Sequence, residues 1–167
     1  LYGHPAPLLE LRQIADKHGM FLIEDNAQAS GATIQGDYTG TIGDASVFSF
    51  NRHKILQCGE GGMVICHDGN IALKMQLIRN HGEVTVEPMG VEDIVNTVGL
   101  NYRMTEMEAA VAGCQFEKMD DLNRQRIALA ERLTEGLGEV AGLEPPAVHD
   151  ACTHVYYLYA MKYYEEI

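Results

Sequence analysis

Hydrophobic residues recur along the chain in two alternating patterns, one typical of helices and one typical of buried strands. Residues 5–19 repeat apolar side chains at helical spacing between Leu8 and Ala15, with prolines before them and Gly19 after them. Residues 20–25 (MFLIED) then place four apolar side chains in a row before two acids. This second pattern predicts a strand that is buried on both faces and ends in polar residues.

The same alternation continues through the middle of the chain. Residues 44–50 and 61–68 have the pattern of two further buried strands, and residues 70–82 return to helical spacing with Gly82 as the predicted stop. Helices that alternate with short buried strands indicate an α/β fold with a mostly parallel sheet. Residues 83–97 are irregular and acidic, so we expect a surface excursion there.

A long helical region is predicted from Thr105 onward. Thr105 and Glu108 have the T-x-x-E spacing of a capping box, which starts a helix by satisfying its first backbone N–H groups. The sulfur-containing and apolar residues on one face of this helix are expected to face the core rather than to ligate a metal. These residues are Met104, Met107, Val111 and Cys114.

A change of pattern near residue 120 predicts a second, smaller domain. First comes an amphipathic helix with its apolar face at Leu122, Leu129, Leu133 and Leu137. After a proline-containing loop, residues 153–164 predict a strand with one face formed by Val155, Tyr157, Tyr159 and Met161. We therefore divide the chain into residues 1–119 and residues 120–167.

Composition and charge exclude several classes of function. Hydrophobic residues make up 46% of the chain and charged residues 22%, as in ordinary soluble globular proteins. The net charge of −12 argues against nucleic acid as a partner, because a duplex repels an acidic surface. No apolar run approaches the roughly 20 residues of a membrane-spanning helix, so no membrane partner is expected.

The cysteines favour free thiols in a reducing, cytoplasmic setting over a disulfide framework, because none has C-x-x-C spacing. They are Cys58, Cys66, Cys114 and Cys152. The histidines lack metal-site spacing, and residues 59–62 (GEGG) do not match a dinucleotide-binding motif. The chain starts at Leu1 rather than Met and stops within a predicted strand, so we expect a fragment of a longer protein.

Polar side chains follow the first two predicted strands, at the edge where open α/β sheets bind ligands. Asp25 and Gln28 come after the first strand, and Ser49 and Lys54 come after the second. An acid and a lysine from neighbouring strand ends commonly form a structural ion pair. They also suit pyridoxal phosphate chemistry, in which a lysine holds the cofactor covalently and an acid pairs with its pyridinium nitrogen. These two residues alone leave both interpretations open.

Four segments in order resemble the pyridoxal-phosphate-dependent sugar aminotransferases of the DegT/DnrJ/EryC1/StrS family, although any one of them alone would be weak. They are residues 23–32 (IEDNAQASGA), 41–54 (TIGDASVFSFNRHK), 59–64 (GEGGMV) and 99–110 (GLNYRMTEMEAA). The resemblance implies the later part of a fold-type-I large domain, a mostly parallel sheet between helices, at residues 1–119. Residues 120–167 would be a linking helix and the truncated start of a small C-terminal α+β domain.

The resemblance also implies roles for four residues around pyridoxal 5'-phosphate. Lys54 would hold the cofactor as a Schiff base and later move the substrate proton. Asp25 would keep the pyridine nitrogen protonated, so that the ring accepts the electrons released at the substrate carbon. Gln28 would contact the hydroxyl side of the ring, and Ser49 would donate its hydroxyl to the phosphate.

Asn101 and Arg103 match positions that reach into the partner subunit's site in such enzymes and help to bind the phosphate. If this match holds, each site needs two chains, so the resemblance implies a homodimer with shared active sites. The alternative for Arg103 is a solvated arginine beside the start of a helix.

The implied reaction moves an amino group from glutamate or glutamine to the keto group of a nucleotide-linked sugar. Some relatives are dehydratases with histidine in place of the lysine, but the spacing from Ser49 and the following glycines keep Lys54, not His53, in register. A sugar dehydratase, a cyclitol aminotransferase and a non-catalytic cofactor-binding relative stay as alternatives. Relatives bring further cofactor-binding residues from a segment before residue 1, so we expect this fragment alone to be inactive and weakly cofactor-bound.

Overall fold

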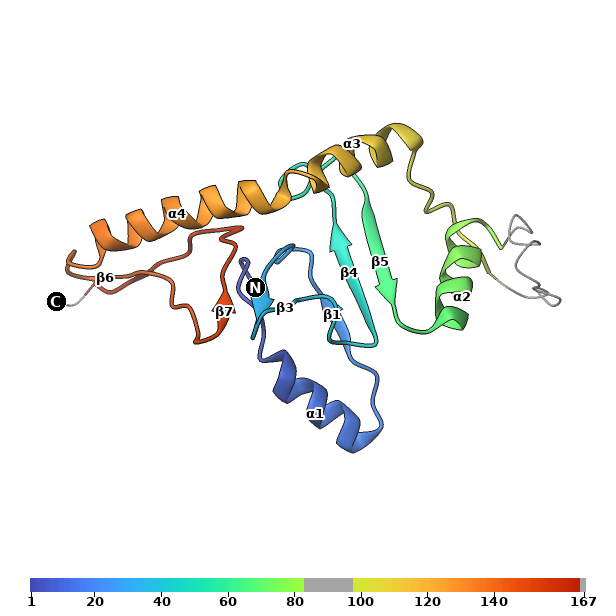
Figure 1. Cartoon of the computed structure of the whole chain (residues 1–167), viewed down its shortest axis with the longest axis horizontal. Helices are drawn as coiled ribbons and strands as arrows, with labels where there is room; N and C mark the ends of the chain where they lie inside the picture. The colour runs from blue at the N-terminus through green and yellow to red at the C-terminus, as the bar shows by residue number, and fades with distance from the viewer. Residues whose placement is uncertain (83–97, 166–167) are drawn as a thin grey trace.

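The computed structural model describes residues 1–82 and 98–165 of the chain. The predicted surface excursion at residues 83–97 lies outside the described residues. Helices and short strands alternate through the described part, so the predicted α/β class is confirmed. Figure 1 shows a central sheet with α1 below it and the α3 and α4 helices above it.

The central sheet consists of β1 (Ile23–Asp25), β4 (Ala45–Ser49) and β5 (Gly62–Cys66), in that order. β1 and β4 are parallel, whereas β4 and β5 are antiparallel. This sheet is therefore mixed rather than mostly parallel in the described residues. β5 reverses direction because residues 50–61 return alongside β4 as a loop without the crossover helix that parallel strands require.

The first two predicted helices are present. α1 (Leu8–His18) ends at Gly19, whose left-handed conformation (φ 60°) suits a glycine at a helix end. α2 (Gly69–Arg79) begins after Asp68, whose carboxylate accepts hydrogen bonds from two backbone N–H groups. The predicted stop at Gly82 is two residues too late, because the helix is capped at Asn80.

The predicted capping box is confirmed at the start of α3 (Glu106–Phe116), which is followed by α4 (Met119–Leu137). Thr105 accepts the Glu108 N–H, and the Glu108 carboxylate accepts the Thr105 N–H. In Figure 1, α4 runs from the end of α3 away from the central sheet toward β6.

The prediction of which helix faces are buried is largely wrong. The exposed fractions are 79% for Met107, 48% for Val111 and 69% for Leu129, and only Met104 of the predicted α3 set packs against the core. Cys114, Leu122 and Leu133 are exposed as well. The buried positions are instead Ala112, Asn123 and Ala130, because short side chains let these helices lie close to the loops beneath them.

The predicted strand over residues 153–164 is wrong. Only its ends are strands: β7 (Cys152–Thr153) pairs with β2 (Thr33–Ile34), and β8 (Lys162–Tyr163) pairs with β6 (Leu143–Glu144). β2 pairs on its other edge with β3 (Asp37–Tyr38). Between β7 and β8, Tyr156 has a left-handed backbone (φ 48°), which ends the alternation of an extended strand.

The first predicted strand is also less buried than expected. Phe21 and Ile23 are 65% and 64% exposed, whereas Glu24 is only 4% exposed. Three residues form this strand, and no layer of the described residues covers its outer face. The acid, rather than the apolar residues before it, therefore faces the interior.

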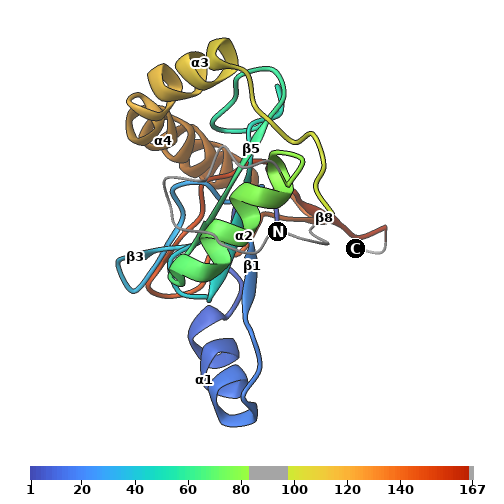
Figure 2. The same ribbon diagram turned by 90° about the vertical axis from the view of Figure 1, so that its right-hand side faces the viewer.

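Two hydrophobic clusters form the core beside the carboxyl ends of β1 and β4. One consists of Ala29, Ala32, Ile55 and Val155, and the other of Phe50, Leu56 and Ala112. Figure 2 shows α1 beyond one end of the central strands and α3 beyond the other. Ile55 belongs to the first cluster and Leu56 to the second, so each cluster includes a residue of the loop that carries Lys54.

Candidate active site at the carboxyl edge of the central sheet

Asp25 and Ser49 lie at the same edge of the central sheet because they end two parallel strands. Asp25 is paired with Val47 in the β1–β4 register, and Ser49 is two residues further along β4. Paired residues in a sheet, and residues two apart along a strand, share a face. The Asp25 and Ser49 side chains therefore project from the same face, as a shared cofactor site requires.

Asp25 is exposed, and its carboxylate has few hydrogen-bond partners among the described residues. Its Oδ1 accepts one hydrogen bond, 3.1 Å from the N–H of Ala27. No ion pair involving Asp25 is present among residues 1–82 and 98–165. The carboxylate is therefore open to a ligand at the end of β1.

Lys54 lies in the loop that follows β4. The loop is closed by backbone hydrogen bonds from Phe50 to Gly61 (2.8 Å) and from Arg52 to Gly59 (2.8 Å), and the Lys54 N–H bonds to the Asn51 carbonyl (2.8 Å). A tight turn thus precedes Lys54. This backbone fixes where the lysine side chain starts.

The Lys54 ammonium contacts an aromatic ring rather than a carboxylate. Its Nζ lies 4.7 Å from the centroid of the Tyr157 ring. In the part of the chain that the structure describes, Lys54 forms no ion pair, so the alternative of a structural Lys54–Asp25 pair is absent there. Sequence reasoning missed Tyr157, because it placed this residue on one face of a predicted strand and gave it no role.

The other two predicted cofactor residues of this edge already have partners. Gln28 is half-buried, and its Oε1 accepts the Tyr2 N–H at 2.8 Å, which ties the start of the chain to the loop after β1. The Ser49 hydroxyl oxygen accepts the Asn51 N–H at 3.4 Å. Since this bond uses only the oxygen, the Ser49 hydroxyl hydrogen can still be donated to an anion.

Asn101 and Arg103 lie on the segment between α2 and α3 rather than at the ends of β1 and β4. Both are exposed, and Arg103 donates from Nη1 to Asn80 Oδ1 at 3.2 Å and from its backbone N–H to Asn101 Oδ1 at 3.4 Å. No recorded contact among the described residues joins either one to Asp25, Gln28, Ser49 or Lys54. Asp25, Gln28, Ser49 and Lys54 thus lie at the ends of β1 and β4 or in the loops that follow them, whereas Asn101 and Arg103 lie on a different segment.

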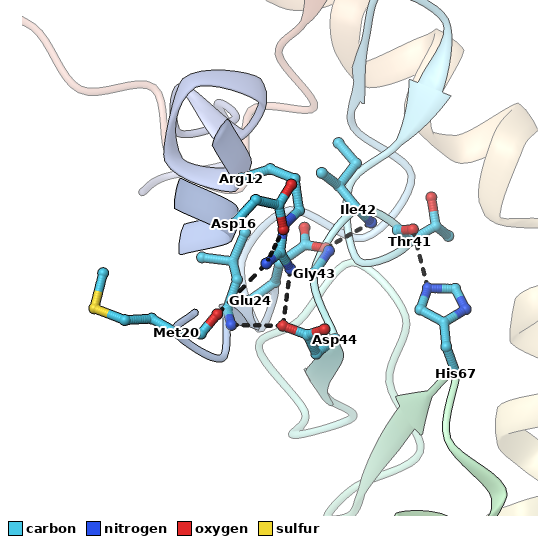
Figure 3. Close-up of polar contacts among 10 residues, drawn as sticks. Arg12, Asp16, Met20, Glu24, Thr41, Ile42, Gly43, Asp44 and His67 are labelled. Carbon is cyan, nitrogen blue, oxygen red and sulfur yellow. Dashed lines mark hydrogen bonds and ion pairs between the residues drawn. The ribbon is translucent and has the colours of Figure 1, made fainter. Parts of the chain in front are cut away.

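Two buried polar residues flank Asp25 and were not predicted to matter. The Glu24 carboxylate accepts the N–H groups of Gly40 (2.6 Å), Ile42 (2.8 Å) and Gly43 (2.6 Å), two of which appear in Figure 3. Asn26 donates from Nδ2 to the Thr39 carbonyl at 2.8 Å. The only signal in the sequence was an acid placed directly after an apolar run.

An ionic cluster of Arg12, Asp16 and Asp44 links α1 to the opposite end of the sheet (Figure 3). Arg12 of α1 bonds through Nη1 to Asp44 Oδ2 (2.8 Å) and through Nη2 to Asp16 Oδ1 (2.6 Å). The hydrogen bond from Arg12 lowers the pKa of Asp44, and the same bond raises the pKa of Arg12. Asp44 precedes β4, so this cluster is structural and distant from the Lys54 end of the strand.

Cys58, in the Lys54 loop, is not poised as a nucleophile. Burial raises the pKa of its thiol, and the negative charges of Glu108 and Glu60 raise it further. Its S–H points to the Glu60 carbonyl at 3.2 Å. Because the thiolate is the reactive form, this environment disfavours reaction of the thiol.

The described residues contain neither a metal-binding group nor a membrane-spanning helix. Across residues 1–82 and 98–165, no group of three or more His, Cys, Asp or Glu side chains is arranged to hold a metal ion. In the same residues, no helix is both long and apolar enough to cross a membrane. All four cysteines carry free thiols.

Comparison with solved structures identifies the class of fold. The chain matches DesV of S. venezuelae with a TM-score of 0.89 and 34% identity, covering 99% of this chain and 43% of that one. The fold is that of the pyridoxal-phosphate-dependent aminotransferases, represented here in part. The family model for the DegT/DnrJ/EryC1/StrS aminotransferase family matches residues 1–167, and the chain belongs to this family. Members of the family use pyridoxal 5'-phosphate.

Two curated relatives indicate the range of proteins in this family. The erythromycin biosynthesis sensory transduction protein EryC1 of Saccharopolyspora erythraea is 37% identical over 164 residues, covering 97% of this chain and 43% of that protein. The dTDP-3-amino-3,4,6-trideoxy-alpha-D-glucose transaminase of Streptomyces venezuelae is 36% identical over 163 residues, covering 97% and 41%. This chain thus spans less than half the length of the relatives it matches.

Proposed function

We propose that the full-length protein containing this chain is a pyridoxal-phosphate-dependent aminotransferase. The observation that carries the proposal is the position of Lys54: a half-buried ammonium at the carboxyl edge of the sheet, without a carboxylate partner among the described residues. Asp25 and Ser49 project from one face of the neighbouring strand ends. An amine, an acid and a hydroxyl at one edge suit a cofactor with a carbonyl, a basic ring nitrogen and a phosphate.

Each residue at this edge has a chemically matched role toward the cofactor. Lys54 would bind the aldehyde carbon covalently, Asp25 would pair with the ring nitrogen, and Ser49 would donate its hydroxyl hydrogen to a phosphate oxygen. Gln28 would contact the hydroxyl side of the ring through its amide NH2, because its Oε1 is bonded to the Tyr2 N–H. The residues present therefore fit the group.

The reaction follows from these roles. When bound, the cofactor withdraws electrons from the substrate carbon, provided its ring nitrogen is protonated. Asp25 keeps that proton in place by its negative charge. The free Lys54 amine would be the general base that takes a proton from the substrate carbon onto Nζ and later delivers it from Nζ.

The proposed substrate is a nucleotide-linked keto-sugar, with glutamate or glutamine as amino donor. The support is the printed activity of relatives such as the dTDP-sugar transaminase, together with the family match over the whole chain. Cyclitol aminotransferases are also members of the family, so a cyclitol is the second candidate substrate. A sugar dehydratase is less favoured, because Lys54 occupies the position expected of the aminotransferases.

A non-catalytic cofactor-binding protein is the candidate from a different class. The name of EryC1, a sensory transduction protein, is the observation that favours it. Turnover separates the two, because a sensor would bind the cofactor through Lys54 but would not pass an amino group to a keto-sugar.

We also propose a homodimer, in which Asn101 and Arg103 complete the site of the partner subunit. Their exposure supports this arrangement, because both side chains are accessible to a second subunit. We propose the division of the chain that the sequence predicts, into residues 1–119 and residues 120–167. We also propose a cytoplasmic location, which the free thiols favour.

The test is borohydride reduction of the full-length protein with pyridoxal 5'-phosphate, followed by peptide mapping. The expected result is a pyridoxyl mass on the peptide that contains Lys54, lost in Lys54→Arg and retained in the control Lys74→Arg. If the Lys54 peptide carries no pyridoxyl mass, the proposed covalent role of Lys54 is wrong. Amino transfer from glutamate or glutamine to a nucleotide keto-sugar would then distinguish an enzyme from a sensor.

A further inference from the structure

Tyr157 contacts the reacting atom of the proposed site, and no role was predicted for it. Its ring centroid lies 4.7 Å from Lys54 Nζ, within the range in which a cation is attracted to the face of an aromatic ring. The described residues offer Lys54 no carboxylate, so this ring is the group that stabilises the ammonium. The contact joins residues from distant parts of the chain.

The position of Tyr157 is fixed by the core that also fixes Lys54. Tyr157 packs against the cluster of Ala29, Ala32, Ile55 and Val155, and Ile55 directly follows Lys54 in the sequence. The lysine and the ring are therefore held by the same buried contacts. The short distance between Lys54 and Tyr157 is therefore set by the packed core rather than by two free surface side chains.

The first residues of the chain hold the Tyr157 backbone from the other side. A Cβ on Gly3 would lie 2.8 Å from the backbone nitrogen of Tyr157, so only a glycine allows this approach. The Leu158 N–H bonds to the Tyr2 carbonyl at 3.2 Å, and the Tyr2 N–H bonds to Gln28 at 2.8 Å. This path links Tyr157 to the loop after β1, at the proposed cofactor edge.

We propose that the Tyr157 ring binds the free Lys54 ammonium and so stabilises the released lysine relative to the cofactor-bound lysine. This inference rests on the proposed function of Lys54. Covalent capture joins the neutral Lys54 nitrogen to the cofactor's aldehyde carbon and releases one water, so Nζ must first lose a proton and leave the ring. Conversely, Lys54 displaced by a substrate amine would leave as a neutral amine, and the ring would receive the ammonium that forms once Nζ has taken a proton from the substrate carbon.

The first test measures the contact itself in the full-length protein without cofactor. Protons above the face of an aromatic ring resonate upfield, so lysine labelled with carbon-13 should show one upfield-shifted ε-methylene, assigned by its loss in Lys54→Arg. Tyr157→Phe should keep this shift, because it keeps the ring, and Tyr157→Leu should abolish it. An unshifted Lys54 in the wild type, or no change in Tyr157→Leu, would overturn the proposal.

The second test measures the equilibrium constant for capture of pyridoxal 5'-phosphate by absorbance. Tyr157→Leu should strengthen capture about two- to five-fold, the worth of one cation–π contact, whereas Tyr157→Phe should leave it unchanged. Tyr38→Leu, at an exposed tyrosine on β3, controls for loss of an aromatic residue as such. Weaker or equal capture by Tyr157→Leu contradicts the inference alone, whereas no covalent capture by the wild type contradicts the proposed function.

Discussion

Ile55 and Leu56 are neighbours in the sequence but pack into two different hydrophobic clusters. Ile55 contacts the cluster of Ala29, Ala32 and Val155, and Leu56 contacts the cluster of Phe50 and Ala112. Lys54 stands directly before them, so its backbone is anchored on two sides while its side chain stays half-buried. This explains how a loop residue can hold a fixed position at the edge of the sheet.

Shortening either anchor should destabilise the fold. Both side chains are nearly fully buried, at 6% and 5% exposed, so Ile55→Ala and Leu56→Ala should each lower the free energy of unfolding by about 2–5 kcal/mol. Urea unfolding measures this difference. Ile14→Ala, at a side chain 50% exposed on α1, is the matched control and should cost much less. Equal losses at the three positions would contradict the two-cluster anchor.

Gly40 should tolerate substitution far less than Gly36, although both have nearly the same backbone. Their φ angles are 94° and 93°, so alanine costs about 1–2 kcal/mol of backbone strain at either position. At Gly40, however, the new Cβ would lie 2.4 Å from the Phe48 ring and 2.9 Å from Asn26, whereas at Gly36 it meets nothing. The difference in melting temperature between Gly40→Ala and Gly36→Ala isolates this packing effect, and its absence would refute it.

Removing the negative charge of Glu24 should loosen the segment that flanks Asp25. Glu24→Gln loses one of the two acceptor oxygens that serve three N–H groups, so we expect a loss of about 1–3 kcal/mol in unfolding free energy. Asn26→Ala should act in the same direction through its lost bond to Thr39. Glu60→Gln, at an exposed carboxylate with one side-chain bond, is the control. A Glu24→Gln protein as stable as Glu60→Gln would show that these bonds contribute little.

Folding stability should fall as the pH drops from about 6.5 toward 4 because of His154. Burial lowers the pKa of this histidine from 6.5 to about 4, and its Nδ1 accepts the Tyr156 N–H, which the protonated ring cannot do. The unfolded chain therefore binds the proton first, and each pH unit within this window costs up to about 1.4 kcal/mol. Above the unfolded pKa the contribution is fully present.

The matching experiment compares urea unfolding at several pH values for the wild type and His154→Asn. The Asn amide oxygen can still accept the Tyr156 N–H but does not titrate, so the variant should lose this part of the pH dependence. His18→Asn, at an exposed histidine of α1, should keep the wild-type profile. A wild-type profile in His154→Asn would assign the pH dependence to other groups.

Local patterns predicted the elements that depend on nearby residues. The periodicity and Gly19 located α1, and the Thr105–Glu108 spacing located the start of α3, because caps form between residues a few positions apart. The strand at residues 44–50 was also predicted, and β4 lies between two neighbouring strands with its apolar residues half-buried. Short-range rules sufficed at these places.

Burial was predicted poorly because it depends on distant segments. Met107 and Val111 have the spacing of a core face, yet α3 turns Ala112 toward Phe50 and Leu56 instead. Residues 154–161 alternate like a strand, yet their backbone bonds to Tyr2 and Gly3 and turns at Tyr156. No local pattern contains the partner that decides these outcomes.

The sequence by itself determined the family, the order of the elements and the residues Asp25, Gln28, Ser49 and Lys54 as candidates, because residue types and spacings along one chain carry that information. Only the tertiary structure decided which of them meet. Parallel pairing of β1 with β4 put Asp25 and Ser49 on one face, and the packed core brought Tyr157 against Lys54. Such contacts depend on hydrogen-bond register and packing between distant segments, which no single stretch of sequence encodes.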